Sequence, residues 1–251
     1  MPSSTTHNGR AGAPRRLLRS EAYEKIKDMI ISGDYEPGVF LSERQLTARL
    51  KMSKTPIRTA LERLDSEGFV VISPQQGVLV KELSFHEIAD LFETRIVLET
   101  YTVQSLSEGL TATQRDSIDR LLESQQDLLV EQSIEGTAEV DLHFHLTLTN
   151  CLGNQEILRV MNQLRDKLLL IFTRHLRRNP HRLLSNYDEH RAIADAIFSG
   201  DGAAAAELMR THLLYGRDYM LSNGRGGDAS QASRPTAAVS VAGPSGSDGK
   251  P

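Results

Sequence analysis

The sequence predicts a mainly α protein in two folded parts, a small head of three helices closed by a short β-hairpin and a larger all-helical bundle. Apolar residues recur at helical spacing almost throughout residues 21–221. The exception is residues 69–80, where short β-branched runs flank turn-forming residues. The chain has 251 residues and 39% hydrophobic content, which is enough for two separate cores.

The head is predicted to contain three helices. The first spans residues 21–32. The second opens at Ser42, because Ser42 and Gln45 have the spacing of a capping box. The third begins around residues 53–56, where a proline is tolerated in the first helical turn, and ends before Gly68.

A β-hairpin is predicted directly after these helices. Residues 69–72 and 78–80 have strand character, and the residues between them have turn chemistry. Three helices closed by a two-stranded wing describe a winged helix-turn-helix. In that arrangement the third helix enters the major groove of DNA and the wing reaches the flanking backbone.

The second part is predicted as an all-helical domain over residues 83–222. Ser84 and Glu87 make a further capping box at its start. The two ends of the chain are rich in Ser, Thr, Gly and Pro, so residues 1–13 and 223–251 are predicted to be disordered and the head to comprise residues 14–82. The six expected helices span residues 84–108, 113–131, 137–151, 155–176, 181–198 and 202–221.

Composition narrows the class of protein. No window reaches the roughly 18 consecutive apolar residues of a membrane span, and no apolar signal core follows the first arginines, so we expect a cytoplasmic protein without a membrane partner. The lone Cys151 lies in an apolar helical stretch, where a buried free thiol is expected.

The charge is divided unevenly along the chain. Residues 1–82 carry 13 Lys and Arg against 10 Asp and Glu, whereas the remainder carries 16 against 23. A basic head on an acidic body is expected when only one domain meets phosphate.

The third helix has a candidate DNA-reading face. Lys54 and Arg58 are four residues apart and project from one face, away from the apolar stripe. Arginine can fork onto guanine, while Lys, Thr and Ser more often position a helix on phosphate. Arg44 in the second helix, and Ser53 and Thr55 beside Lys54, are placed to join them. The alternative interpretation is a solvated helix face.

Several motifs of the head closely resemble the GntR superfamily of bacterial regulators. They are residues 30–38 (IISGDYEPG), 41–46 (LSERQL) and 53–61 (SKTPIRTAL), with Glu67-Gly68 and the wing glycine Gly77. Lys54 stands where arginine is commoner in that family. The resemblance implies that operator DNA is contacted by Arg44, Ser53, Lys54, Thr55, Arg58, Gln76 and Gly77.

The helical domain contains a candidate metal-binding set. Asp141 and His145 lie one helical turn apart, so a carboxylate and an imidazole can chelate one divalent ion. His190 and His212 occur in later helices. On spacing alone, a surface pair is the alternative for Asp141 and His145.

A second resemblance concerns the same residues. Asp141-x-x-Phe144-His145, then residues 189–201 beginning Glu189-His190, and then His212 resemble the FCD-type effector domain of the FadR branch. The resemblance covers most of residues 83–221. It implies that a divalent metal at the floor of a cavity in the bundle is held by Asp141, His145, His190 and His212. His143 and His175 match no ligand position. Nitrogen and oxygen ligands of this kind suit zinc, nickel or manganese.

A small carboxylate effector is the ligand expected at such a metal. One anionic and three neutral ligands leave a divalent ion with net positive charge, which attracts an organic acid. Arg95, a recurrent feature of these domains, can bind that carboxylate in a bidentate manner. An ion pair between Arg95 and Glu99, one turn away, is the alternative.

The expected function is a transcriptional regulator, with repression favoured, whose operator affinity responds to a small organic acid. A homodimer is expected because one recognition helix covers only a half-site and symmetric dimers read inverted repeats. One alternative is a metal sensor without an organic effector. A metal-dependent enzyme is disfavoured, because no spare acid or base accompanies the cluster and the winged helix would be unexplained.

Overall fold

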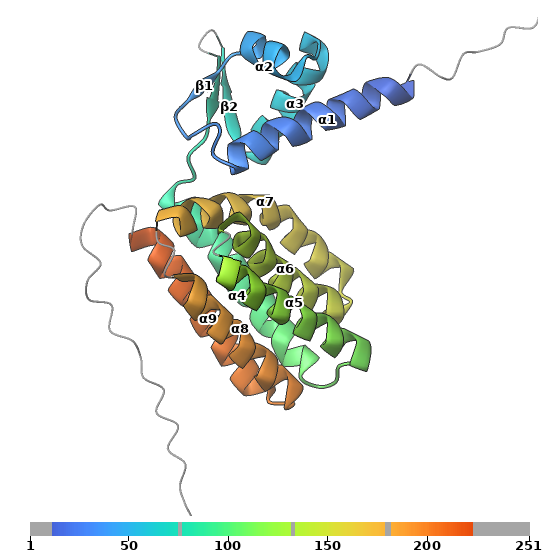
Figure 1. The fold of residues 1–251 in the computed structure, drawn as a ribbon, viewed down its shortest axis with the longest axis vertical. Coiled ribbons are helices and arrows are strands. Elements are labelled where there is room, and N and C mark those ends of the chain that lie inside the picture. The colour runs from blue at the N-terminus through green and yellow to red at the C-terminus, as the bar shows by residue number, and fades with distance from the viewer. Residues whose placement is uncertain (1–11, 75–76, 132–133, 179–181, 223–251) are drawn as a thin grey trace, which may run out of the picture.

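The structure, a computed structural model, describes residues 12–74, 77–131, 134–178 and 182–222. Figure 1 shows the two parts one above the other, with the helix–strand head at one end and the six-helix bundle at the other. The fold class predicted from the sequence is confirmed. The elements are α1 (Gly12–Ile31), β1 (Phe40–Leu41), α2 (Glu43–Leu50), α3 (Lys54–Glu67), β2 (Val70–Ser73), β3 (Gly77–Val80), α4 (Phe85–Leu106), α5 (Ala112–Glu131), α6 (Ile134–Leu152), α7 (Gln155–Arg178), α8 (Arg182–Phe198) and α9 (Gly202–Ser222).

Helix α2 begins, and helix α3 ends, at the residues that the sequence predicts. The hydroxyl of Ser42 accepts a hydrogen bond from the Gln45 N–H at 3.1 Å, which is one half of the predicted capping box. Gly68 ends α3 with φ +82°, a left-handed conformation that glycine adopts without strain. The apolar stripe of α3 is fully buried, and its members are Ile57, Leu61 and Leu64.

Two details of the head differ from the sequence prediction. Helix α1 begins at Gly12 rather than near Glu21, so Gly12 and Ala13 belong to a helix and not to a disordered end. Leu17 and Leu18 in this extension are exposed, so no apolar stripe marked it, although Ala, Leu and Arg favour helix.

The wing sheet has three strands rather than two. Phe40 pairs with Leu79 and Leu41 with Val78, so β1 joins the hairpin in the order β1-β3-β2. A strand of two residues is too short to show the alternation by which strands are recognised in a sequence.

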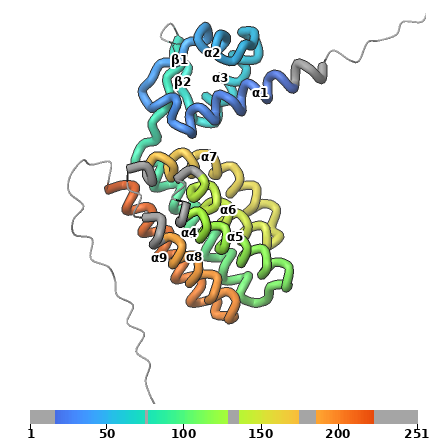
Figure 2. The backbone as a smooth tube through the Cα atoms, in the orientation of Figure 1, coloured from blue at the N-terminus to red at the C-terminus, as the bar shows by residue number. Residues whose placement is uncertain are grey.

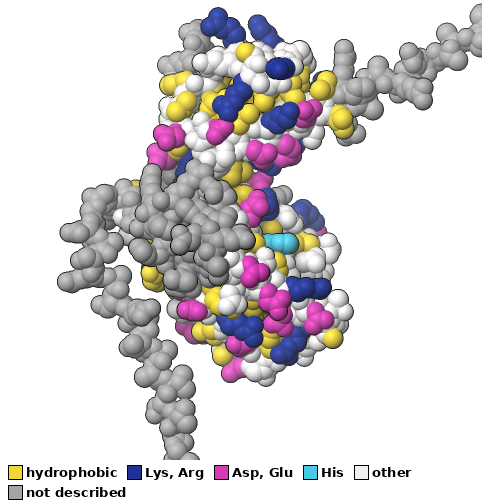
Figure 3. All heavy atoms as spheres, in the orientation of Figure 1, with side chains coloured by type: hydrophobic (Ala, Val, Ile, Leu, Met, Phe, Trp, Pro, Cys, Tyr) yellow, Lys and Arg dark blue, Asp and Glu magenta, His cyan; other side chains and the backbone are white. Residues whose placement is uncertain are grey.

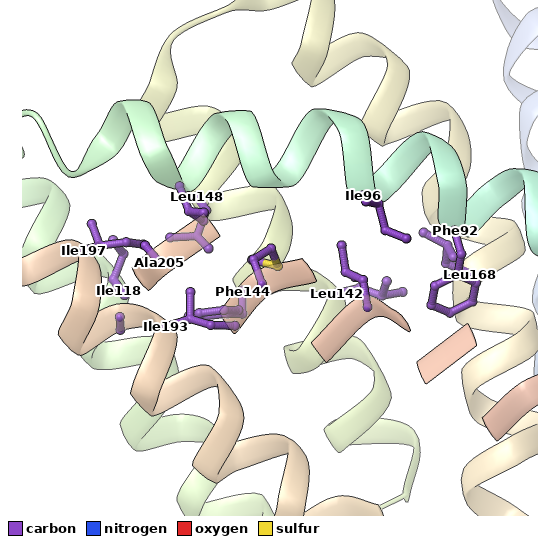
Figure 4. Close-up of a cluster of buried hydrophobic side chains, with 14 of the residues drawn as sticks. Phe92, Ile96, Ile118, Leu142, Phe144, Leu148, Leu168, Ile193, Ile197 and Ala205 are labelled. Carbon is purple, nitrogen blue, oxygen red and sulfur yellow. The ribbon is translucent and has the colours of Figure 1, made fainter. Parts of the chain in front are cut away.

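The helical domain packs its six helices around one apolar core. Figure 4 shows part of it, with Phe92 and Ile96 of α4 facing Leu142 and Phe144 of α6, and with Leu168 of α7 nearby. The domain opens at the predicted capping box, in which the Ser84 hydroxyl accepts from Glu87 N–H at 3.2 Å and the Glu87 carboxylate from Ser84 N–H at 3.0 Å. None of the described helices has the length and apolar run needed to cross a membrane.

The cores of the two parts meet at α7. Leu170 of α7 is 2% exposed and belongs to the core of the head, whereas Leu169 and Ile171 belong to the core of the bundle. Ile31 and Leu83 pack against both cores. The tube in Figure 2 shows α7 running between the head and the rest of the bundle.

Candidate DNA interface and metal centre

The predicted DNA-reading residues of α3 and α2 are all on the surface. Arg44, Ser53, Lys54 and Thr55 are exposed. The Arg58 side chain is 71% exposed, and its nearest acidic neighbour is Glu43, with 3.5 Å between Arg58 Nε and Glu43 Oε1.

The N-terminal end of α3 is open to a partner. Ser53 is the N-cap residue, yet its hydroxyl makes no capping hydrogen bond. The first N–H groups of a helix carry partial positive charge and suit a phosphate. Figure 3 shows Lys and Arg side chains at the end of the head farthest from the bundle, on the face in view.

Two of the predicted DNA contacts, Gln76 and Gly77, belong to the wing. Gly77 is exposed at the start of β3 with φ +106°. Gln76 lies outside the described residues. The structure therefore locates six of the seven predicted DNA contacts on the head's surface.

Three of the predicted metal ligands converge inside the bundle. His145 of α6, His190 of α8 and His212 of α9 are buried, and one ring nitrogen from each lies within 4.8 Å of the others. The Nε2 atoms of His190 and His212 are 3.4 Å apart. Two nitrogen ligands at about 2.0–2.1 Å from a tetrahedral metal lie about 3.3 Å from each other.

Asp141, the fourth predicted ligand, lies beside this group. One carboxylate oxygen is 3.5 Å from His190 Nε2 and the other is 4.0 Å from His145 Nε2. Asn186 of α8 donates its side-chain N–H to the Asp141 carboxylate at 2.6 Å, which orients that group. Binding an ion would draw these atoms a little closer together.

Each histidine contacts an oxygen through its other ring nitrogen. Nδ1 of His212 is 2.6 Å from Glu189 Oε2, and Nδ1 of His190 is 3.0 Å from Gln125 Oε1. Nδ1 of His145 contacts the buried carboxylate of Glu99. Because a carboxylate or an amide oxygen can only accept, each Nδ1 carries a proton, and in a neutral ring Nε2 then presents a lone pair.

The protonation states suit a metal. Burial holds the pKa values of His145 and His212 below the usual histidine value, so both rings are neutral near pH 7. His145 Nε2 is buried and has no hydrogen-bond partner among the described residues. The donor set therefore fits a divalent metal that accepts neutral imidazole, such as zinc, nickel or manganese.

A small cavity opens beside the histidines. Its volume is about 30 Å³. Arg95 and Glu99 form a buried ion pair at 2.7 Å, so the alternative suggested by the sequence is present. Nη2 of Arg95 nevertheless remains buried without a hydrogen-bond partner among the described residues. Residues lining the cavity include Phe92, Arg95, Asp141, Phe172, Asn186, His212 and Tyr219.

The residues that orient the ligands were not identified from the sequence as site residues. Glu99 is 2% exposed, and Arg95 and His145 bring its pKa to about 2 although burial alone would raise it. Glu189 adjoins His190 in the quoted motif, which was the one available signal. Gln125 had no sequence signal, because it lies on α5, 65 residues before its partner His190.

Two other histidines, His143 and His175, match no ligand position of the family. His143 is exposed, and the side chain of His175 lies outside the described part of the chain.

Comparison with known proteins identifies both parts. Residues 18–80 match the gntR family of bacterial regulatory proteins, and residues 90–215 match the FCD domain. The transcriptional regulator LutR of Bacillus subtilis is 30% identical over 76% of this chain and 96% of its own length. The repressor GlaR of Escherichia coli is 27% identical over 77% of this chain and 91% of its own length.

A solved structure shares the fold. A GntR-type transcriptional regulator from Rhodococcus sp. RHA1 superposes with a TM-score of 0.71 and 23% identity, covering 82% of this chain and 98% of the other. The relatives are regulators and not enzymes. The chain therefore belongs to the gntR family of bacterial regulatory proteins and is a transcriptional regulator with a DNA-binding head and an FCD domain.

Proposed function

We propose that this regulator binds an inverted-repeat operator as a homodimer, and that a small carboxylic acid bound beside a divalent metal in the FCD domain changes its operator affinity. Repression is the favoured sign, because GlaR and a gluconate-operon regulator of Bacillus licheniformis among its relatives are named repressors. One observation carries the proposal. His212, Asp141 and Arg95 line a single cavity, His145 and His190 lie beside His212, and Arg95 Nη2 has no hydrogen-bond partner among the described residues.

Each half of this site has a distinct role. Asp141, His145, His190 and His212 would hold the metal, which supplies a positive centre with open positions for an acid's oxygens. Glu99 holds Arg95 through Nε and leaves Nη2 to donate to the carboxylate. The Phe92 and Phe172 rings line the same cavity, and their apolar surface lowers the local dielectric constant, which strengthens both contacts.

The size of the cavity links binding to movement. At about 30 Å³ the space holds one or two water molecules but no organic acid. An acid therefore has to displace side chains that line the cavity. A ligand that prefers the expanded arrangement shifts the protein toward it, and this preference is the source of a regulatory signal.

The same cavity favours a metal sensor as the second candidate, since a metal with a bound water needs no expansion. The two candidates differ in what changes operator affinity. A sensor responds to metal alone, whereas the proposed regulator requires an organic acid in addition.

An operator titration tests the proposal. A thermal-shift screen of small mono- and dicarboxylic acids on the zinc-loaded protein identifies an acid that raises the melting temperature, because such an acid binds the folded state. That acid is then expected to change the affinity for operator DNA, selected with the same protein, by about 5- to 150-fold. Asp141→Ala should abolish the response and leave acid-free operator binding largely intact.

Glu139→Ala is the matched control, because Glu139 is an exposed acidic residue on the same helix. It should respond like the parent protein. If the Asp141 variant kept the full response, the signal would not pass through the metal. If metal alone produced the change, the metal sensor would replace the proposed function.

A further inference from the structure

Helix α7 joins the DNA-binding head and the cavity. Its residue Leu170 is buried in the core of the head, and Phe172 lines the cavity in the bundle. The two residues are about 200° apart around the helix, at about 100° per residue, so they project from opposite faces. In Figure 1, α7 runs across the end of the bundle that meets the head, with α1 above it.

An ion pair reinforces the contact between α7 and α1. Lys27 Nζ of α1 lies 2.9 Å from the Asp166 carboxylate of α7, and the Lys27 side chain is only 12% exposed. Burial lowers the pKa of Lys27, but hydrogen bonds to Asp166 and Glu24 outweigh it and raise the value, so the ammonium stays charged. Lys27 also pairs with Glu24 on its own helix, and Asp166 with Arg165 on its own helix, so it is the Lys27–Asp166 contact that joins α1 to α7.

The same helix reaches the recognition helix. The Lys167 ammonium lies against Gly68 at the C-terminal end of α3, 3.4 Å from the position that a Cβ would take there. A positive charge at a helix C-terminus is favourable. Tyr23 of α1 donates to the carboxylate of Glu67 at 2.6 Å, which ties α1 to the last turn of α3. Helix α7 therefore holds both α1 and the helix that presents Lys54 and Arg58.

On the cavity side, Phe172 contacts the residues proposed to meet the effector. Its ring lies edge-on to Phe92 at 6.3 Å between centroids, and the Arg95 guanidinium is 5.6 Å from its centre. Leu168, Leu169 and Ile171 on the same helix are buried in the bundle core. Because packed interiors have few voids, a displaced Phe172 ring moves the helix that carries it.

We infer that α7 is the route within one chain by which occupancy of the cavity reaches the recognition helix. Its docking face, defined as Asp166, Lys167 and Leu170, fixes the orientation of the head, and Phe172 senses the cavity. The inference rests on the proposed function only in taking the cavity as the place where a ligand enters. The contact through α7 is a second connection between the two parts, in addition to the short segment between Val80 and Leu83 that links them covalently.

Amide hydrogen exchange on the full chain, without metal, acid or DNA, tests this route. Asp166→Asn and Leu170→Ala should speed exchange in the last turns of α1 and α3 by about tenfold, the loss expected for one charge-assisted hydrogen bond or docking contact. The double variant Lys27→Met/Asp166→Asn should be no faster than Asp166→Asn, since the two residues act as a pair. Glu156→Gln, which alters an exposed acid on α7, should match the parent.

The cavity side is tested by Phe172→Ala, with Phe172→Leu if the first variant folds poorly. Exchange should rise in the cavity helices and also at the end of α1. Parent-like exchange in α1 and α3 for both docking variants would overturn the docking. A Phe172 effect confined to the bundle would overturn the transmission. Neither result would bear on whether a metal or an acid binds, so failure of the route and failure of the proposed function are distinguishable.

Discussion

His190 is completely buried, and its neighbours fix the direction of its ring. Gln125 contacts Nδ1 at 3.0 Å, and Phe144 stacks on the ring at 4.2 Å between centroids with 16° between planes. The stack on Phe144 fixes the plane of the ring, and a flip within that plane would lose the contact with Gln125. Nε2 therefore keeps pointing toward His212, as a ligand held ready for a metal requires.

The guanidinium of Arg58 is exposed and only weakly paired, so it is available to contact DNA. Its contact with Glu43 joins exposed side chains at 3.5 Å, and such pairs are worth at most about 1 kcal/mol. Arg58→Ala is expected to weaken specific operator binding by about 1–3 kcal/mol and to relax the preference at one base pair per half-site. Binding isotherms on operators with single substitutions, at fixed salt, measure both effects.

Arg44→Ala is the comparison, because the loss of a contact to the DNA backbone should weaken binding evenly across operator sequences. Parent-like operator binding by both variants would mean that the DNA-reading surface lies elsewhere.

Helix α4 has one face that lines the candidate metal and effector site and another face that is exposed on the surface of the bundle. Arg95 and Glu99 point into the bundle, whereas Val97 and Tyr101 are 68% and 55% exposed. Helix α9 packs along α4 and exposes Leu208 and Tyr215. We propose that a second copy of the chain covers this apolar α4/α9 face, which would supply the homodimer that an inverted repeat requires.

Val97→Glu is therefore expected to convert the proposed dimer to monomers at micromolar concentration, because a charge would be buried in an apolar interface. Analytical ultracentrifugation measures the change in mass. Val71→Glu is the control, since Val71 is an exposed valine on the wing sheet. A Val97 variant that stays dimeric would place the interface elsewhere.

The elements that the sequence predicted well are those with long apolar periods or strong caps. All six helices of the FCD domain start within three residues of the predicted positions, because each buries a stripe in the core. The start of α1 and strand β1 were missed for the opposite reason. Leu17 and Leu18 bury nothing, and Phe40–Leu41 is a strand only through its pairing with β3.

The site was predictable only in part. Spacing suggested Asp141 and His145, and family resemblance supplied His190 and His212. Their convergence depends on how α6, α8 and α9 pack, which periodicity does not encode. The orienting residues come from distant positions, with Glu99 lying 46 residues before His145 and Gln125 lying 65 before His190.

At the scale of the whole molecule, three features are connected. The head exposes Arg58 on α3, the bundle encloses a histidine cluster beside Arg95, and α7 packs against both. The histidine cluster is the feature on which the others depend. Without a metal, the expected effector has only Arg95 to bind.

Metal content is therefore the most direct test. Protein purified without chelators and analysed by mass spectrometry for elements should carry about one zinc, nickel or manganese ion per chain, the occupancy that one cluster of four ligands allows. His190→Ala should lose the ion and melt at a lower temperature, whereas His143→Ala, which alters an exposed histidine, should keep both. A parent protein that neither carries nor takes up any of these metals, with a His190 variant of unchanged melting temperature, would contradict the account.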